Sequence, residues 1–385
     1  MKFELEDMFE REAIIKVIGV GGGGGNAVDH MINTGISGVD FIGANTDAQA
    51  LRRLSVDTLI QLGSELTQGL GAGTNPDIGK QAAQEDRSRI EEEIDGADMV
   101  FLTAGMGGGT GTGAIPVIAE AAKDKGILTV AVVTKPFKFE GAKKMKAAEE
   151  GIVELEKYVD SLIIIPNQKL LPVLGNNVSL IDAFNAANDV LREAVQGITE
   201  LIVNPGLINV DFADVKTVMS EMGVAIMGTG IAKGDNRARE AAEKAVACPL
   251  LDDVNLFGAK GILVNITATA ELGIAEFNEV GEIVHEFASE DAVIKMGTAI
   301  DTELGDEIKV TVVATGMGGA PHRQTVSSIS SRESVAKKAV DYGVFEKPTA
   351  VRQREGSEAR YGAQAKKAEN MDYLDIPAFL RRQAD

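Results

Sequence analysis

GGGTGTG at residues 107–113 is the most informative segment of this 385-residue chain. It follows an apolar run at residues 99–102 and precedes a helix-like run at residues 114–123. A strand that passes through glycines into a helix binds anions, because backbone N–H groups point inward and the helix N-terminus carries partial positive charge. The segment lacks the Gly-Lys-Ser/Thr of a Walker A loop. It therefore predicts an anion site built from backbone N–H groups and the hydroxyls of Thr110 and Thr112.

A second glycine run, residues 21–25, lies between an apolar strand at residues 14–20 and a helix that starts near Asn26. Read alone, it fits either a flexible linker or a dinucleotide fingerprint, with Asp47 near the place of the ribose-binding acid. Two such loops in one parallel sheet bring their helix N-termini together, which suits a longer polyphosphate. A third glycine segment, residues 69–76, is expected to cover that site.

Apolar strands that alternate with helices predict an α/β fold with a parallel sheet covered on both faces. We expect a Rossmann-like sheet domain, a long central helix with two apolar edges, a smaller α/β domain, and then a disordered tail. The predicted boundaries are a flexible N-terminus at 1–12, a nucleotide-binding domain at 13–178, the helix at 179–205, the second domain at 206–319, a disordered linker at 320–371 and a partner-binding peptide at 372–385.

Within that plan the sequence predicts the following elements. Strands are expected at residues 14–20, 39–44, 99–103, 128–133, 161–165, 261–267, 293–299 and 308–314, and helices from Asn26 onward and at residues 77–93, 114–124, 141–158, 179–203, 237–247 and 277–288.

Composition excludes several classes of function. The net charge of −20 argues against nucleic acid as a partner, because binding to phosphate backbones needs basic surface. A single cysteine, Cys248, excludes an internal disulfide and a cysteine-based zinc site, and the three histidines are not at ligand spacing. The acidic N-terminus lacks a signal peptide, and no apolar run reaches the length of a membrane span, so we expect a cytoplasmic protein that does not insert into the membrane.

Together these motifs resemble the FtsZ/tubulin family of GTPases. Residues 107–113 resemble the tubulin signature, residues 21–26 the first nucleotide loop of FtsZ, and residues 372–381 the FtsZ C-terminal peptide. The resemblance runs from about Ile14 to Met317. It implies a tubulin/FtsZ-like fold, binding of GTP and GDP, and hydrolysis of GTP that depends on assembly. It further implies head-to-tail filaments that form the cytokinetic ring at the bacterial mid-cell, on the inner face of the membrane.

The resemblance also implies residue roles. The α/β-phosphate side would be lined by Gly22, Gly23, Gly24, Gly25 and Asn26, and the β/γ-phosphates by Gly107, Gly108, Gly109, Thr110, Gly111 and Thr112. Glu140 would bind the ribose, Asn167 and Asp189 would read the guanine edge, and Phe184 would stack on the base. From spacing alone, Phe184 fits a core position equally well, and Asp189 fits a solvated helix position. Lys144 departs from the arginine usual in the family, and lysine offers a point charge where arginine offers a planar fork.

Asn209, Asp211 and Asp214 form a second group of candidate site residues, which we call the acidic loop. From sequence alone, Asp211 as helix N-cap and Asp214 in the first turn explain the pattern. The resemblance implies that this loop enters the nucleotide site of the next subunit. There, both acids would polarise the attacking water and help hold a hydrated cation, and Asn209 would touch the γ-phosphate. Mg²⁺ is expected as a largely water-coordinated counter-charge.

The peptide from Asp372 to Arg382 carries an apolar cluster at the end of the linker. It fits either a frayed end or a segment that folds onto a partner groove. The resemblance implies the membrane-tethering division proteins FtsA and ZipA as partners. Two rival functions stay open at this point: a non-hydrolysing scaffold of the same fold, and an NAD-dependent oxidoreductase. The oxidoreductase would need a suitable constellation of catalytic His or Cys residues, which the sequence lacks.

Overall fold

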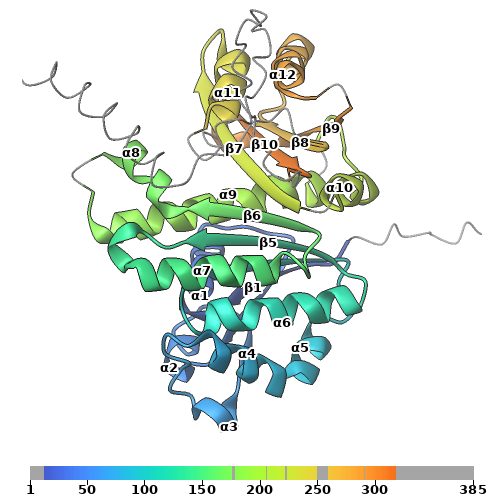
Figure 1. Cartoon of the computed structure of the whole chain (residues 1–385). Helices are drawn as coiled ribbons and strands as arrows, with labels where there is room; N and C mark the ends of the chain where they lie inside the picture. The colour runs from blue at the N-terminus through green and yellow to red at the C-terminus, as the bar shows by residue number, and fades with distance from the viewer. Residues whose placement is uncertain are drawn as a thin grey trace, which may run out of the picture. The chain divides into compact units, whose positions relative to one another are not determined.

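The computed structural model describes residues 13–175, 178–204, 206–221, 223–248, 259–289 and 291–317 (Figure 1). The predicted flexible N-terminus (1–12), linker (320–371) and C-terminal peptide (372–385) lie outside the described residues.

One sheet runs through the described part of the chain. Its strands, in order across the sheet, are β3 (Thr58–Gln61), β2 (Asp40–Asn45), β1 (Ile15–Val20), β4 (Met99–Gly105), β5 (Leu128–Lys135), β6 (Ser161–Pro166), β7 (Gly223–Lys233), β10 (Glu307–Thr315), β8 (Gly261–Ala268) and β9 (Val293–Ile300). Pairing is parallel from β3 to β7, whereas β10 is antiparallel to both β7 and β8. Strand β7 joins the two halves, because it pairs with β6 at its start and with β10 beyond it.

The helices alternate with these strands. They are α1 (Gly21–Asn33), α2 (Ala48–Leu51), α3 (Ser64–Thr67), α4 (Pro76–Glu85), α5 (Arg87–Glu93), α6 (Thr110–Asp124), α7 (Ala142–Leu155), α8 (Leu171–Leu174), α9 (Leu180–Val203), α10 (Phe212–Met219), α11 (Arg237–Val246) and α12 (Ile274–Phe287). Short 3₁₀ helices lie at Lys138–Glu140, Asn167–Lys169 and Thr302–Leu304.

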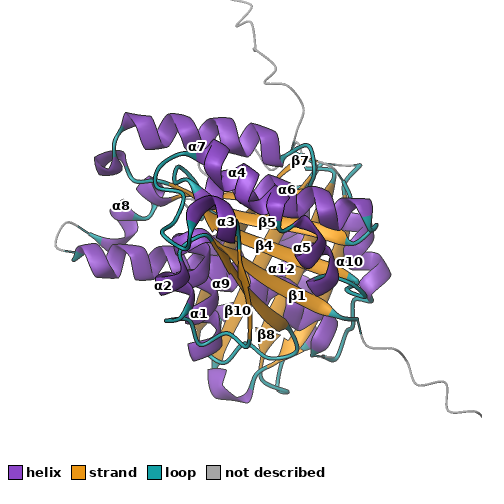
Figure 2. Ribbon diagram, turned by 90° about the horizontal axis from the view of Figure 1, so that it is seen from below, coloured by secondary structure: helices purple, strands orange, loops and turns teal. Residues whose placement is uncertain are grey.

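Helices cover both faces of the parallel part of the sheet, as predicted (Figure 2). Along β4, Val100 and Leu102 pack with the α6 side, whereas Met99 and Phe101 pack with the α1 and α9 side. All of these side chains are fully buried. Because successive strand residues point to opposite faces, a strand buried on both faces reads as a continuous apolar run.

Helix α9 is the predicted long helix. It begins after Ser179, whose Oγ accepts from the Asp182 N–H at 3.1 Å. One edge of α9 packs in the core with α1 and β5. On the other edge, the Glu200 carboxylate accepts from Asn265 Nδ2 at 3.0 Å and from Thr267 Oγ1 at 3.1 Å, both on β8. The helix therefore lies between the two halves of the sheet.

The halves share one continuous sheet and belong to one compact unit. The division into domains at residues 178 and 205 thus stays a prediction. In the described part of the chain, helices that combine the length and the apolarity of a membrane span are absent.

Several element predictions need correction. Strands β3 and β7 were not predicted, α1 and α6 begin earlier, at Gly21 and Thr110, and the predicted helix at 77–93 is interrupted. Asp86 lies at the interruption, where its Oδ2 accepts from the Gly63 N–H at 2.6 Å.

Candidate functional site

A cavity of about 400 Å³ lies at the carboxyl ends of β1, β4, β5 and β6. In parallel α/β sheets this edge is where ligands bind. The cavity brings both glycine loops together. The predicted site residues that line it are Gly22, Gly23, Asn26, Gly108, Gly109, Thr110, Gly111, Glu140, Lys144, Asn167 and Phe184.

Other predicted residues lie behind this lining and shape it. A Cβ on Gly24 would lie 2.2 Å from the Thr103 carbonyl oxygen, so glycine lets α1 approach β4. Gly25 is buried against Leu54. Gly107 has φ +98°, a backbone conformation that side chains rarely adopt. The Thr112 hydroxyl, 3 % exposed, accepts from the Gly107 N–H at 2.8 Å and so fixes the start of the loop.

The third glycine segment, residues 69–76, contributes to the edge of the cavity. Gly73 is one of the lining residues. A Cβ on Gly109 would lie 2.6 Å from the Gly73 carbonyl oxygen, so the two loops are in backbone contact. Thr110 Oγ1 is also tied to Thr46 Oγ1 at 2.6 Å. Three glycine-rich segments therefore present backbone groups to one space.

Glu140 and Lys144 form the charged wall of the cavity. The Glu140 carboxylate accepts from the Phe137 N–H at 2.9 Å and pairs with Lys144 Nζ at 3.1 Å. Among the described lining residues, Glu140 is the only carboxylate. The cavity thus offers many donors to an anion but has no pair of acids that could activate water.

Asn167 and Phe184 lie at the end of the cavity formed by the residues after β6 and by α9. Asn167 is 4 % exposed, and its Oδ1 is buried without a hydrogen-bond partner, which favours a ligand donor at this position. The Phe184 ring is 40 % exposed and meets the Phe137 ring edge-on, with centroids 5.5 Å apart. This exposure argues against a core role for Phe184.

Asp189 does not line the cavity; its Oδ1 lies 2.8 Å from Nε2 of His30 on α1. Its neighbour Asn188 does line it, together with Ala187 and Leu191. Helical spacing from Phe184 places these residues on one face, which is the signal that could have identified them. Further lining residues that sequence reasoning missed are Gly105, Met106, Thr134 and Pro136.

Asp47 serves as a helix cap. Its Oδ1 accepts from the N–H groups of Gln49 and Ala50 at 2.8 and 3.1 Å, at the start of α2. It is not among the residues lining the cavity. Asp47, which the sequence placed near the position of a ribose-binding acid, therefore has a structural role as a helix cap.

The two acids of the acidic loop lie at the start of α10. Asp211 is the N-cap, and its Oδ1 accepts from the Asp214 N–H at 2.7 Å, so the capping interpretation is confirmed. Asp214 Oδ1 lies 2.7 Å from Lys295 Nζ on β9. Asn209 and Asp211 are exposed.

Helix α9 separates these acids from the cavity of the same chain. Phe184 lies near its N-terminus, and Asp211 follows its C-terminus. The last residue of α9 that lines the cavity is Leu191. At about 1.5 Å per residue, the helix from Leu191 to Val203 measures roughly 18 Å. In Figure 1, α8 next to the start of α9 lies on the left, whereas α10 lies on the right. The cavity and the acidic loop therefore lie at opposite ends of α9.

Family models match both halves of the chain. Residues 14–175 match the Tubulin/FtsZ family, GTPase domain, and residues 223–318 match the FtsZ family, C-terminal domain. The chain is 57% identical to the cell division protein FtsZ of Pseudomonas aeruginosa, over 100% of both chains. It is 58% identical to that of Coxiella burnetii, over 99% of both chains.

A solved structure gives the same result for the fold. An empty FtsZ dimer of M. jannaschii matches with a TM-score of 0.78 and 45% identity, covering 82% of this chain and 91% of that one.

Proposed function

The chain belongs to the FtsZ family, and from this membership we infer that it is a GTPase that assembles into filaments for cell division. It binds guanine nucleotide and hydrolyses GTP to GDP and phosphate. The observation that carries the mechanism is the separation of the donor-rich cavity from the acids of α10. Neither end holds a complete hydrolytic site, so assembly must complete it.

In this proposal the nucleotide fills the cavity at the carboxyl edge of the sheet. The loop residues after β1 and β4 bind the phosphates through backbone N–H groups and the Thr110 hydroxyl. Glu140 accepts from the ribose hydroxyls, with Lys144 beside it. Asn167 binds the guanine edge and Phe184 contacts the base. Asp189 lies outside the lining, next to Asn188, and would have to reach the guanine edge with Oδ2, because its Oδ1 faces His30. The unpartnered Asn167 Oδ1 and the exposed Phe184 ring support this orientation.

The α10 end of one subunit then docks over the cavity of the next. Asp211 and Asp214 orient the attacking water, and Asn209 contacts the γ-phosphate. Phosphoryl transfer depends mainly on positioning and on stabilising charge, so acids supplied by a neighbour can control it. A contact between two different surfaces of the same chain does not close on itself and builds filaments.

Mg²⁺ fits this site as a hydrated ion. Among the described residues, no cluster of three or more His, Cys, Asp or Glu side chains could hold a metal ion. Asp211 and Asp214 would help to hold the hydrated ion. When bound, it neutralises phosphate charge.

Two rival functions are less well supported. Family membership favours an enzyme that hydrolyses GTP over a non-hydrolysing scaffold. The capping role of Asp47 removes the residue that a dinucleotide site would need for the ribose. Identifying the nucleotide released when the purified protein is denatured separates these cases, since NAD would contradict our proposal.

The C-terminal peptide is the proposed partner-binding segment. Through Asp372 to Arg382 the filament would bind FtsA and ZipA, which would hold it at the inner face of the membrane at mid-cell. An apolar cluster beyond a polar linker suits folding onto a groove of another protein. Removing residues 372–385 should abolish binding to both proteins and leave GTP turnover intact.

Turnover measured against protein concentration tests the central claim. We expect phosphate release per molecule to rise steeply with concentration and to vanish on dilution below the assembly threshold. Asp214→Ala should retain GTP binding and lose hydrolysis. Turnover that is independent of concentration would contradict a site completed by assembly, and loss of binding together with hydrolysis would indicate a folding role for Asp214.

A further inference from the structure

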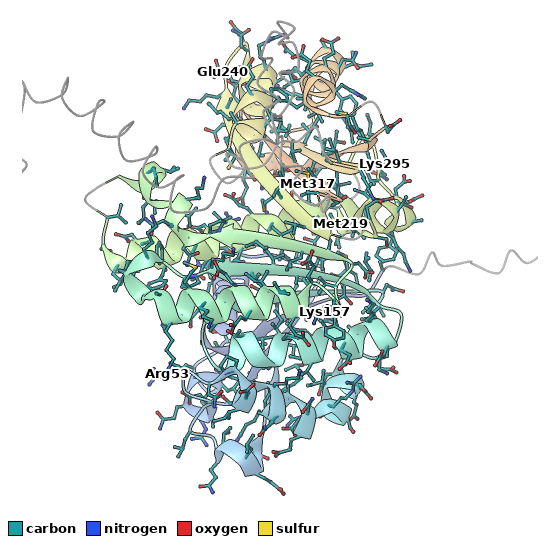
Figure 3. The ribbon with its side chains drawn as sticks, in the orientation of Figure 1. Arg53, Lys157, Met219, Glu240, Lys295 and Met317 are labelled. Atoms are coloured by element: carbon teal, nitrogen blue, oxygen red, sulfur yellow. The ribbon has the colours of Figure 1, made fainter. Side chains whose placement is uncertain are left out.

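Lys295 on β9 forms an ion pair with Asp214, one of the two proposed catalytic acids. Its Nζ lies 2.7 Å from Asp214 Oδ1, and both side chains are 36 % exposed. In Figure 3, Lys295 is labelled close to Met219, the last residue of α10, on the side of the molecule away from the label of Glu240 on α11. None of the family-derived roles involves this lysine.

Strand β9 also contacts the loop that precedes α10. Thr298 exchanges two hydrogen bonds with Ile208, one through each backbone N–H, both at 3.0 Å. Gly297 leaves space for Val210, whose Cγ2 would lie 2.6 Å from a Cβ at that position. Strand β9 therefore fixes the residues beside Asn209, and Lys295 extends the same support to Asp214.

The ion pair with Lys295 involves Oδ1 of Asp214. The Asp211 Oδ1 atom is already engaged by the Asp214 N–H. The two acids and the lysine together carry a formal charge of −1, where the acids alone would carry −2. A less negative surface reduces repulsion when a polyphosphate on another subunit approaches.

We propose that Lys295 is a positioning residue for GTP hydrolysis in the neighbouring subunit: it fixes the Asp214 carboxylate and offsets its charge at the subunit contact. This inference rests on the proposed function, in which Asp214 acts across that contact. A simpler role exists, because β9 is the edge strand of the sheet and edge lysines oppose strand-to-strand aggregation.

Lys295→Gln separates the two roles, because glutamine keeps the edge polar while removing the charge. We expect this variant to bind GTP like the wild type when unassembled. Its critical concentration for GTP-dependent assembly should rise about three- to tenfold, and turnover per assembled subunit should fall by a similar factor. Lys295→Arg should restore both. Lys244→Gln is the matched control, since Lys244 pairs with Glu240 on α11 at 3.8 Å, and it should change neither.

A double-mutant cycle measured by sedimentation ties the effect to Asp214. In an Asp214→Asn background, Lys295→Gln should no longer change the critical concentration, because its partner charge is gone. An undiminished effect in that background, or wild-type assembly and turnover of Lys295→Gln alone, would overturn the role of Lys295. If Asp214→Asn itself leaves turnover unchanged, the proposed function fails first, and the two failures are thereby distinguished.

Discussion

The glycines of this chain fall into two physical classes. At Gly24, a Cβ would lie 2.2 Å from the Thr103 carbonyl oxygen, so the absence of a side chain serves packing. At Gly22 and Gly108, a Cβ would meet no protein atom within 4 Å, yet both residues line the cavity. In the proposed site, their missing side chains would leave room for the phosphates.

This distinction predicts opposite outcomes for two substitutions. Gly108→Val should fold with a wild-type melting temperature and lose GTP affinity by about 10- to 100-fold, because its side chain occupies phosphate space. Gly24→Ala should instead lower the free energy of unfolding by about 1–3 kcal/mol. Calorimetry together with nucleotide titration checks both, and a Gly108→Val protein that binds GTP normally would place the phosphates elsewhere.

Glu193 on α9 predicts a pH dependence of stability. Burial raises the pKa of Glu193, although Arg192 and Lys309 pull this pKa downward. In the unfolded chain, the pKa of glutamate is about 4.3. As the pH rises through this value, the unfolded chain loses the Glu193 proton while the native state still keeps it. Glu193 therefore favours the native state below that pH, and this contribution is lost as the pH rises through the native pKa.

Glu193→Gln should accordingly raise the melting temperature at pH 7 by a few degrees, about 2–4 °C for each kcal/mol of stability gained. The difference from the wild type should disappear near pH 4. A stabilisation that persists unchanged at pH 4 would show that ionisation of Glu193 is not its cause.

At the scale of elements, Asp211 caps α10 and, in our proposal, also takes part in GTP hydrolysis. Asparagine caps helices about as well as aspartate does, but it lacks the negative charge. Asp211→Asn should therefore keep the wild-type melting temperature and lose about a hundredfold in GTP turnover, as loss of a general base does. Asp211→Ala should lose turnover and also about 1 kcal/mol of stability. Equal turnover in Asp211→Asn and the wild type would leave Asp211 with a capping role alone.

The sequence predicted elements well where local pattern and tertiary structure agree. Strand β4 is one case, because its unbroken apolar run suits a strand buried on both faces. Strand β7 was missed because Gly223, Gly228 and Gly230 weaken its strand pattern, and only pairing with β6 and β10 stabilises it. Helix α1 starts inside a glycine run because contact with β4 outweighs the low helix propensity of glycine.

The same limit applies to the candidate site. The loops were predictable because glycine and hydroxyl residues leave a local signal. Three features depend on contacts that only folding creates: the hydrogen bond from His30 to the Asp189 carboxylate, the ion pair between Asp214 and Lys295, and the position of Asn188 in the cavity lining. Single-sequence patterns carry no direct information about such contacts.

For the whole molecule, roughly 18 Å of α9 separates the cavity lining at Leu191 from the acidic loop. We therefore propose that GTP hydrolysis is a property of a pair of chains. Two variants, each defective at one end, should therefore complement each other. Asp214→Ala keeps an intact cavity, and Gly108→Val keeps intact acids. We expect each to show little GTP turnover alone and their mixture to recover part of the wild-type rate, because one kind of contact is complete.

The control for this experiment is a chain that carries both substitutions. Mixed with Asp214→Ala, it offers no intact acid to the remaining cavities, so turnover should stay at background at every mixing ratio. Phosphate release measured across mixing ratios at constant total protein distinguishes the cases. Because a site completed within one chain cannot be rescued by another, a mixture no more active than its components would contradict the shared site, provided that sedimentation shows both chains in the same filaments.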